Sequence, residues 1–254
     1  MAIGDISAVI ITRDAAETLP ECLQSLQAFP EVVVYDNGST DNTVDIAETF
    51  PNVRVHRGAF LGFGPTKQKA VSLAQHDWVF SIDADEQVDD QLIKAIDNAD
   101  LSEPGLAYLV CRHNYFMGKH VTRGGWGDDW LLRLFNRNSC RFNDAQVHEK
   151  VVPVDGVQNV RLDGVLQHAA VRELGDFLVK IKRYSEISSR STHKRRGPFA
   201  ALANSFWRFF KSYFIKAGFL EGWRGLVIAV SDANGGFWRD LRAYADRRTG
   251  RRRD

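Results

Sequence analysis

Two carboxylates one residue apart, Asp83 and Asp85, directly follow the apolar run Trp78–Ile82. A short apolar run of this kind indicates a buried strand. The carboxyl ends of parallel strands form the sheet edge at which open α/β folds bind ligands. Adjacent carboxylates repel each other unless a cation lies between them, and oxygen ligands suit Mg²⁺ or Mn²⁺. The pattern predicts a divalent-cation site completed by phosphate oxygens, with a solvated acidic loop as the alternative.

Two further segments place polar residues beside predicted strands. Val32–Thr43 has the pattern of a buried strand, a tight turn at Gly38 and a helix. Gly62–Lys69 puts glycines before a helix N-terminus and Lys67 in its first turn, an arrangement that suits an anion. Taken alone, each segment is also typical of an ordinary connection between a strand and a helix.

The three segments, in this order, resemble the family 2 glycosyltransferases, which are inverting enzymes built on the nucleotide-sugar-binding GT-A fold. The opening residues Ala8–Leu26 look like the first strand and helix of that family. Lys67 stands sixteen residues before Asp83, where such enzymes commonly carry a basic residue. Three later segments resemble the branch that builds lipopolysaccharide cores, including glucosyltransferases acting on inner-core heptose: Leu131–Arg137, Val147–Glu149 and Leu166–His168.

The resemblance implies roles for the residues around the expected metal. Asp85 would be the direct ligand, whereas Asp83 would hold a ribose hydroxyl or reach the metal through water. His168 would be a further ligand or a diphosphate contact. Arg133 lies in an otherwise apolar strand, so its charge requires a partner. The diphosphate or Asp129 would serve, and a structural ion pair is the alternative.

The nucleotide is expected at the ends of the first two strands. Asp36 would hydrogen-bond the base or the ribose, and Lys67 is a candidate contact for the donor. Arg13-Asp14 replaces the aromatic-Asn pair that is commoner in the family, so the identity of the base stays open. The full set of residues predicted for this pocket is Thr12, Arg13, Asp14, Asp36, Gly38 and Ser39.

A base for the acceptor hydroxyl has two candidates. Glu149 matches the place where the fold commonly carries its base, and His148 beside it would orient it or contact the acceptor. Asp129 is the rival, because it follows the glycine-rich turn Gly124–Gly127. That turn could cover the donor sugar, with Trp126 stacking on a ring or packing in the core. A surface carboxylate is the alternative for either acid.

Composition indicates an ordinary globular protein of 254 residues, 44% hydrophobic and 26% charged. Three cysteines without metal-type spacing favour a reducing compartment. Asp5 interrupts the N-terminal apolar residues, which are therefore expected to form a strand and not a signal peptide. We predict a GT-A catalytic domain over 1–170, divided into a nucleotide-sugar half (1–100) and an acceptor half (101–170), followed by a helical segment over 171–254.

The C-terminal part is strongly basic. Residues 172–254 hold 19 of the 33 Lys and Arg but only 8 of the 32 Asp and Glu, which gives +11 against −10 for the rest. Such asymmetry favours an anionic partner, either nucleic acid or a membrane. The longest uncharged run, Gly197–Trp207, has eleven residues, too few to span a bilayer. Aromatic residues beside Lys and Arg favour a helix in the headgroup region, and no nucleic-acid motif is found. A helical packing cap is the alternative.

The predicted fold class is α/β, with a mostly parallel central sheet, helices on both faces and a basic amphipathic helical tail. Up to residue 97 the pattern alternates strands and helices, and from 106 to 168 it predicts an antiparallel extension. The expected strands are 6–12, 31–36, 53–57 and 77–82, and the expected helices are 16–27, 42–50, 66–76 and 89–97.

The predicted function is metal-dependent, inverting transfer of a hexose, glucose from UDP-glucose, to a lipid-linked saccharide such as the lipopolysaccharide inner core. The expected location is cytoplasmic and peripheral, on the inner face of the cell membrane. Polyprenyl-phosphate glycosyl transfer and a non-catalytic nucleotide-sugar or nucleic-acid binding protein are the alternatives.

Overall fold

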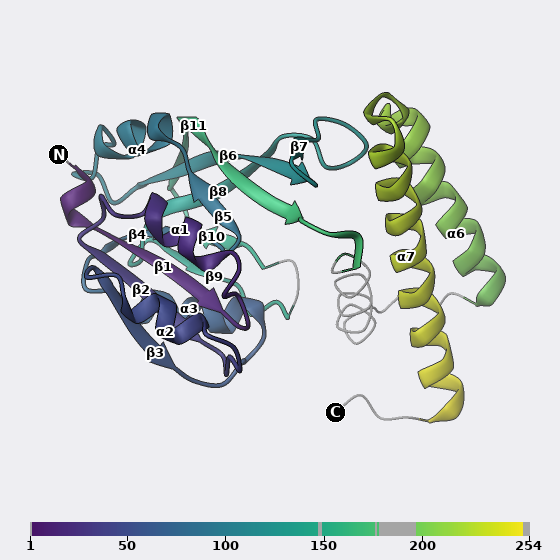
Figure 1. Ribbon diagram of the computed structural model, residues 1–254, viewed down its shortest axis with the longest axis horizontal. Coiled ribbons are helices and arrows are strands. Elements are labelled where there is room, and N and C mark those ends of the chain that lie inside the picture. Colours follow the sequence, from purple (N-terminus) through teal and green to yellow (C-terminus); the bar gives the residue numbers. More distant parts are fainter. Residues whose placement is uncertain (1, 147–148, 176, 178–196, 251–254) are drawn as a thin grey trace. The chain divides into compact units, whose positions relative to one another are not determined.

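The computed structural model describes residues 2–146, 149–175, 177 and 197–250 (Figure 1). The chain forms two compact units. The first contains residues 1–113 and 129–168, and the second contains residues 114–128 and 169–254. The expected domain boundary at residue 170 stays a prediction.

The N-terminal part of the first unit alternates strands and helices as the sequence predicts. The elements are β1 (Ile6–Thr12), α1 (Leu19–Ser25), β2 (Glu31–Asp36), α2 (Thr43–Glu48), β3 (Val53–Arg57), α3 (Phe63–Ser72) and β4 (Trp78–Ser81). The strands pair in parallel in the order β3-β2-β1-β4. The order therefore runs outward in one direction from β1 to β3 and reverses at β4. Ligands bind at such a switch point in open α/β sheets, outside the carboxyl ends of the strands.

The rest of the sheet is antiparallel. The remaining elements are β5 (Glu86–Val88), α4 (Asp90–Asp97), β6 (Leu106–Phe116), β7 (Lys119–His120), β8 (Asp129–Asn136), β9 (Cys140–Phe142), β10 (Val151–Pro153) and β11 (Gln158–Val171). Antiparallel pairing joins β4 to β8, β8 to β6, and β11 to β5. The α/β class and the antiparallel extension are confirmed. The sheet is mixed and not mostly parallel, because no helix follows β6 or β8 to carry the chain back for a parallel crossover.

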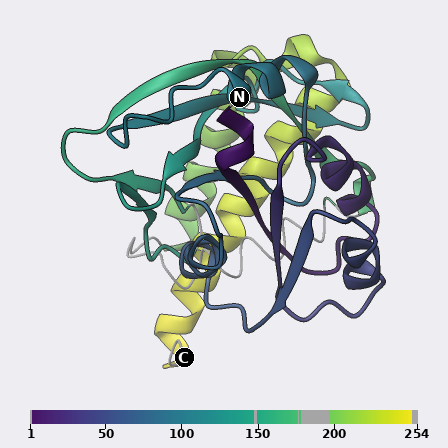
Figure 2. The same cartoon turned by 90° about the vertical axis from the view of Figure 1, so that its left-hand side faces the viewer.

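Helices cover both faces of the parallel strands (Figure 2). On β1, Ile6, Ala8 and Ile10 face one core together with residues of α1, α2 and α4, while Val9 faces a second core with α3. This alternation follows from the two-residue period of a strand. Fully buried large side chains such as Phe29 and Phe80, whose rings stack with centroids 5.5 Å apart, fix β4 against the first core.

The second unit is mainly helical. It contains α6 (Pro198–Phe210), the π-helical turn η2 (Lys211–Ile215), the 3₁₀ turn η3 (Gly218–Glu221) and α7 (Trp223–Thr249). Helices α6 and α7 lie side by side (Figure 1). A small core joins Phe116, Val121, Val171, Phe177 and Ile228. The helical character predicted for this part is confirmed, and no helix in the described ranges is long and apolar enough to cross a membrane.

Candidate active site

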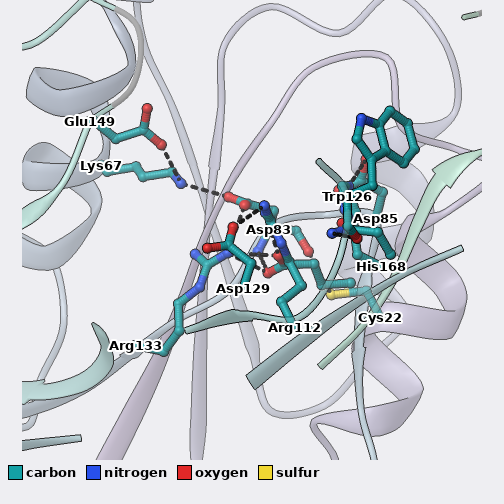
Figure 3. Close-up of polar contacts among 12 residues, drawn as sticks. Cys22, Lys67, Asp83, Asp85, Arg112, Trp126, Asp129, Arg133, Glu149 and His168 are labelled. Atoms are coloured by element: carbon teal, nitrogen blue, oxygen red, sulfur yellow. Dashed lines mark hydrogen bonds and ion pairs between the residues drawn. The ribbon is translucent and has the colours of Figure 1, made fainter. Parts of the chain in front are cut away.

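Lys67 bridges two carboxylates at the carboxyl edge of the first unit's sheet (Figure 3). Its Nζ lies 2.7 Å from Oδ1 of Asp83 and 2.7 Å from Oε1 of Glu149. Helix α3 holds the lysine there because its start lies close to the loop before Glu149. Gly64 makes this approach possible, since a Cβ at Gly64 would lie 1.9 Å from the carbonyl oxygen of Asn143. Three predicted site residues from distant segments therefore meet.

A second cation, Arg133 of β8, holds Asp83 from the other side. Its Nη2 lies 3.0 Å from Oδ2 of Asp83 and 2.7 Å from Oε1 of Glu86. Glu86 is fully buried and also accepts the backbone N–H of Asp83 at 2.9 Å. The Nη1 of Arg112, on β6, lies 3.4 Å from Oε1 of Glu86, and its Nη2 lies 2.9 Å from Oδ2 of Asp129. Arg133 thus has carboxylate partners in the protein, and its contact with a diphosphate or with Asp129 stays a prediction.

The charges in this network set the ionisation of its members. Burial raises the pKa of Asp83, but the nearby Lys67 and Arg133 charges outweigh it and hold the pKa well below its usual range. Burial lowers the pKa of Lys67, and its carboxylate neighbours, Asp83 foremost, raise it by more. Asp83 is therefore an anion and Lys67 a cation at neutral pH.

Asp85 and His168 lie together, apart from the lysine. His168 is on β11 opposite Glu86 of β5, and its Nε2 lies 3.4 Å from Oδ2 of Asp85. Neighbouring ligands of one divalent ion are about 3 Å apart when each bond is about 2.1 Å, so these two atoms fit one ion. In the part of the chain that the structure describes, Asp83 does not join them in a group of ligand atoms within 4.8 Å of one another.

Carboxylates and cations alternate around these residues. Five carboxylates (Asp83, Asp85, Glu86, Asp129 and Glu149) lie among three cations (Lys67, Arg112 and Arg133). The carboxylate oxygen of Asp85 suits Mg²⁺ or Mn²⁺, whereas an imidazole nitrogen suits transition metals, so the pair favours Mn²⁺ over Mg²⁺.

The ends of β1 and β2 form a separate part of the same sheet edge. Thr12 and Asp36 are paired in register. The buried carboxylate of Asp36 accepts the N–H groups of Gly38, at 3.0 Å, and Ser39, at 3.1 Å, and thereby shapes the turn after β2. The side chain of Thr12 is buried, and its Oγ1 has no hydrogen-bond partner among the described residues.

Asp14 and Arg13 connect the loops at this edge. Asp14 has a φ of +50° and accepts the backbone N–H of Thr40 at 2.7 Å, while its own N–H donates to Ser39 Oγ at 2.9 Å. The hydrogen bond from the Thr40 backbone holds the pKa of Asp14 below its usual value. Arg13 pairs with Asp14 at 3.4 Å, and about half of its side chain is exposed. The six residues predicted for the nucleotide pocket thus lie at the ends of β1 and β2 and on the two cross-linked loops that follow them.

The two candidate bases differ in their partners. Glu149 is bound by the buried Lys67 and its side chain is 17% exposed. Asp129, at the start of β8, is bound by Arg112 and is 45% exposed. Both lie in the first unit, and His148 lies outside the described residues.

Trp126 belongs to the second unit. Its ring packs against Phe116 and Phe177, with centroids 6.0 and 5.8 Å apart, and Asn114 Nδ2 donates to its backbone oxygen at 3.2 Å. This tryptophan is thus partly buried against the small core of the second unit, and its stacking on a donor sugar stays a prediction.

Two members of the network, Glu86 and Arg112, were not predicted from the sequence. Glu86 follows Asp85 directly, and its burial arises because β5 pairs with β11, which follows much later in the chain. Arg112 interrupts the apolar run of β6 in the same way that Arg133 interrupts β8. A charged residue in an apolar strand was the signal available for both arginines.

The comparisons with known proteins identify the family. The model for glycosyl transferase family 2 matches residues 7–150, which is more than half of the chain and includes Lys67, Asp83, Asp85, Asp129, Arg133 and Glu149. The chain belongs to this family, as its sequence motifs predicted.

Two similar proteins are named as glycosyltransferases. The lipopolysaccharide core biosynthesis glycosyltransferase LpsC of Rhizobium meliloti is 30% identical over 190 residues, which cover 72% of this chain and 70% of LpsC. An uncharacterized glycosyltransferase of Rickettsia typhi is 28% identical over 239 residues, covering 89% of this chain and 82% of that protein. A crystal structure of S. aureus TarS 1-349 in complex with UDP-GlcNAc is 16% identical, covers 98% of this chain and 93% of that one, and has a TM-score of 0.46. The family and the named relatives make this protein a glycosyltransferase.

Proposed function

We propose that this glycosyltransferase moves a hexose, glucose from UDP-glucose, onto a lipid-linked saccharide such as the lipopolysaccharide inner core, with inversion and with a divalent metal. The observation that carries the proposal is that Asp83, which Lys67 links to Glu149, and Asp85, which is paired with His168, both follow β4 at the switch point of the sheet. The acceptor class is proposed by similarity to LpsC, whose name assigns it to lipopolysaccharide core synthesis.

Inverting transfer forms a bond between the acceptor oxygen and the anomeric carbon while the bond to the diphosphate breaks. The acceptor hydroxyl loses its proton to a carboxylate, and the diphosphate leaves from the opposite side. Asp85 and His168 would hold the metal, which when bound supplies positive charge to the departing diphosphate. Asp83 would take the ribose hydroxyl or a metal-bound water, because its carboxylate is already fixed by Lys67 and Arg133.

Glu149 is the proposed base. In this structure its Oε1 is paired with Lys67, which would compete with an acceptor hydroxyl for that atom. The second oxygen of Glu149 takes no part in this pair, and a carboxylate has several acceptor positions. Lys67 would therefore orient Glu149 on one oxygen and leave the other to take the proton. Asp129, oriented by Arg112, is the rival base.

The nucleotide would bind across the loops that follow β1 and β2. Asp36, Gly38 and Ser39 form a turn whose shape depends on the Asp36 carboxylate, so they would position backbone groups around the base or the ribose. Thr12, which is paired with Asp36 at the strand ends, would line the same pocket. Arg13 supplies an exposed guanidinium at the same edge.

We also propose that the second unit attaches the enzyme peripherally to the anionic inner face of the cell membrane, where a lipid-linked acceptor would be reached. Large apolar side chains of this unit are exposed to solvent, among them Phe199 at 90% and Phe206 at 69%. Exposed apolar side chains beside basic ones suit the surface of an anionic membrane, where apolar acyl chains lie beneath negatively charged headgroups.

A donor survey tests the proposed reaction. The full chain would be incubated with Mn²⁺ and one of four donors: UDP-glucose, UDP-galactose, UDP-N-acetylglucosamine or GDP-mannose. Each donor would be tested with two acceptors, a lipid-linked inner-core saccharide and polyprenyl phosphate. We expect transfer from UDP-glucose to the core saccharide, and loss of transfer with EDTA. Transfer only to polyprenyl phosphate would establish the alternative enzyme, and nucleotide binding without any transfer or donor hydrolysis would indicate a binding protein.

A further inference from the structure

The second unit contains a cavity of about 370 Å³ that the proposed reaction does not use. Its lining residues all belong to that unit and combine indoles with cations: Trp126, Trp207, Arg208, Lys211 and Lys216. The volume falls within the range of small-molecule sites in proteins. The cavity is therefore large enough for a small ligand.

A π-helical turn brings the two lysines to the cavity. The backbone N–H of Lys216 donates to the carbonyl oxygen of Lys211 at 2.9 Å, which closes a turn of five residues in place of the usual four. Residues five apart are then stacked on one side of the helix. Such turns are rare and occur frequently at functional sites. The turn explains why Lys211 and Lys216 line the same cavity.

A glycine turn closes the opposite side. The N–H of Gly124 donates to the Lys216 carbonyl oxygen at 3.0 Å, and the Ser212 hydroxyl donates to the Gly124 carbonyl oxygen. Gly124 and Gly125 have φ of +78° and +112°, values that glycine adopts without strain. A Cβ at Gly125 would lie 3.5 Å from Lys216 Nζ, so the ammonium lies over bare backbone. Hydrogen bonds on both sides therefore hold the cavity's walls in place.

The lining has a surplus of positive charge. Arg208 is paired with Asp232 at 2.9 Å, so this arginine is neutralised within the wall. Among the residues that the structure describes, neither Lys211 nor Lys216 forms an ion pair. Two lysines remain to balance a ligand, and a phosphate monoester carries a charge of about −1.5 to −2 at neutral pH. Lysine is a common phosphate ligand in proteins.

We propose that this cavity binds a phosphorylated sugar unit of the acceptor. The phosphate would lie between Lys211 and Lys216, and the apolar face of the sugar ring would lie against Trp207, whose side chain is 54% exposed. This inference rests on the proposed function for the identity of the ligand as part of an acceptor. It concerns a site other than that of the donor and the metal.

The test is calorimetric binding of glucose 6-phosphate to the full chain, without donor and without metal. Inorganic phosphate and glucose serve as the two partial ligands. We expect glucose 6-phosphate to bind more tightly than either, and Lys211→Ala with Lys216→Ala to weaken it roughly tenfold or more, since hydrogen bonds to charged groups are strong. The matched control is Arg247→Ala with Arg248→Ala, which removes two charges of the same unit outside the cavity. It should bind as the wild type does.

A second substitution separates the sugar from the phosphate. Trp207→Ala should weaken glucose 6-phosphate and leave inorganic phosphate unchanged, because only the ring loses a contact. Equal binding by the lysine variant and the wild type would overturn the proposal, as would glucose 6-phosphate binding no tighter than inorganic phosphate. If the cavity binds glucose 6-phosphate but no lipid-linked saccharide is glycosylated, the proposed function fails alone. If transfer occurs and the lysine variant binds and transfers normally, the cavity proposal fails alone.

Discussion

Lys67 and Glu149 are distant in the sequence, yet the lysine Nζ lies 2.7 Å from the glutamate Oε1. The same nitrogen lies 2.7 Å from Asp83, and only 5% of Lys67 is exposed. The lysine therefore links the segment of the first acidic residue to the segment of the proposed base. Its charge is held by both carboxylates, so the three groups depend on one another for both stability and orientation.

Replacing Lys67 with Met should lower the free energy of unfolding by about 3–5 kcal/mol, the range for breaking a buried ion pair by removing one partner. The cause is that Glu149 would lose its cation and that Asp83 would keep only Arg133. Urea denaturation followed by circular dichroism measures it. Lys69→Met, at an exposed position of the same helix, is the control and should change stability by less than about 0.5 kcal/mol. Equal effects of the two substitutions would show that Lys67 contributes no special stability.

Glu149→Gln should leave donor binding normal and reduce transfer by roughly 10²-fold or more, as expected for loss of a general base. Asp129→Asn is the matched change at the rival, and it should reduce transfer much less. Initial rates and nucleotide titrations of both variants decide between them. Because Glu149 also pairs with Lys67, the unfolding curve of each variant is recorded to separate loss of the base from loss of stability. The reverse pattern of rates would make Asp129 the base.

Asp85→Ala should abolish transfer and the metal-dependent part of nucleotide binding while the fold persists. The substitution removes a candidate ligand beside His168 and no side chain of the core. Nucleotide affinity would be titrated with Mn²⁺ and with EDTA. Asp45→Ala, at an exposed position of α2, should behave as the wild type does. Metal dependence that survives in the Asp85 variant would exclude this residue as a ligand.

The sequence predicted the parallel part of the fold well because each strand there is followed by a helix with its own periodicity. It also predicted Lys67, Asp83, Arg133 and Glu149 as site residues, although their roles stay predictions. Glu86 escaped prediction because its burial depends on pairing between β5 and β11, which are far apart in the chain. The antiparallel extension over 106–168 was predicted, but the order in which β6, β8 and β11 pair was not, because pairing between distant strands leaves no local signal.

Glu31 should make the stability of the protein depend on pH. Burial raises its pKa, but hydrogen bonds from Gln75, Ser7 and Arg54 lower it by more, so the folded pKa lies below the ordinary value. A carboxylate with a lowered folded pKa stabilises the protein above its unfolded pKa of about 4.3, and this contribution is lost as the pH falls through the folded pKa. The difference in unfolding free energy between wild type and Glu31→Gln should be largest above about pH 5 and shrink below pH 4. Urea titrations from pH 3 to 7 measure it, and a difference that stays constant over this range would contradict the assignment.

Phe199→Ser with Phe206→Ser should weaken binding of the full chain to anionic vesicles by roughly tenfold or more. Each ring would lose apolar burial worth about 1.5–3 kcal/mol when fully inserted, and partial insertion still leaves a large effect for the pair. Both side chains are mostly exposed, so the substitutions should change stability little. Co-sedimentation with vesicles of phosphatidylglycerol and phosphatidylcholine measures the binding.

The control is Val154→Ser with Val160→Ser, which changes two exposed positions of the first unit and should bind as the wild type does. Added salt should lower the vesicle affinity of both proteins, because it screens the basic residues. The ratio of the two affinities should persist, because the contribution of the phenylalanines is not electrostatic. If the wild type stays in solution at low salt, the second unit does not bind membranes. If the variant binds as tightly as the wild type, Phe199 and Phe206 do not contribute to membrane binding.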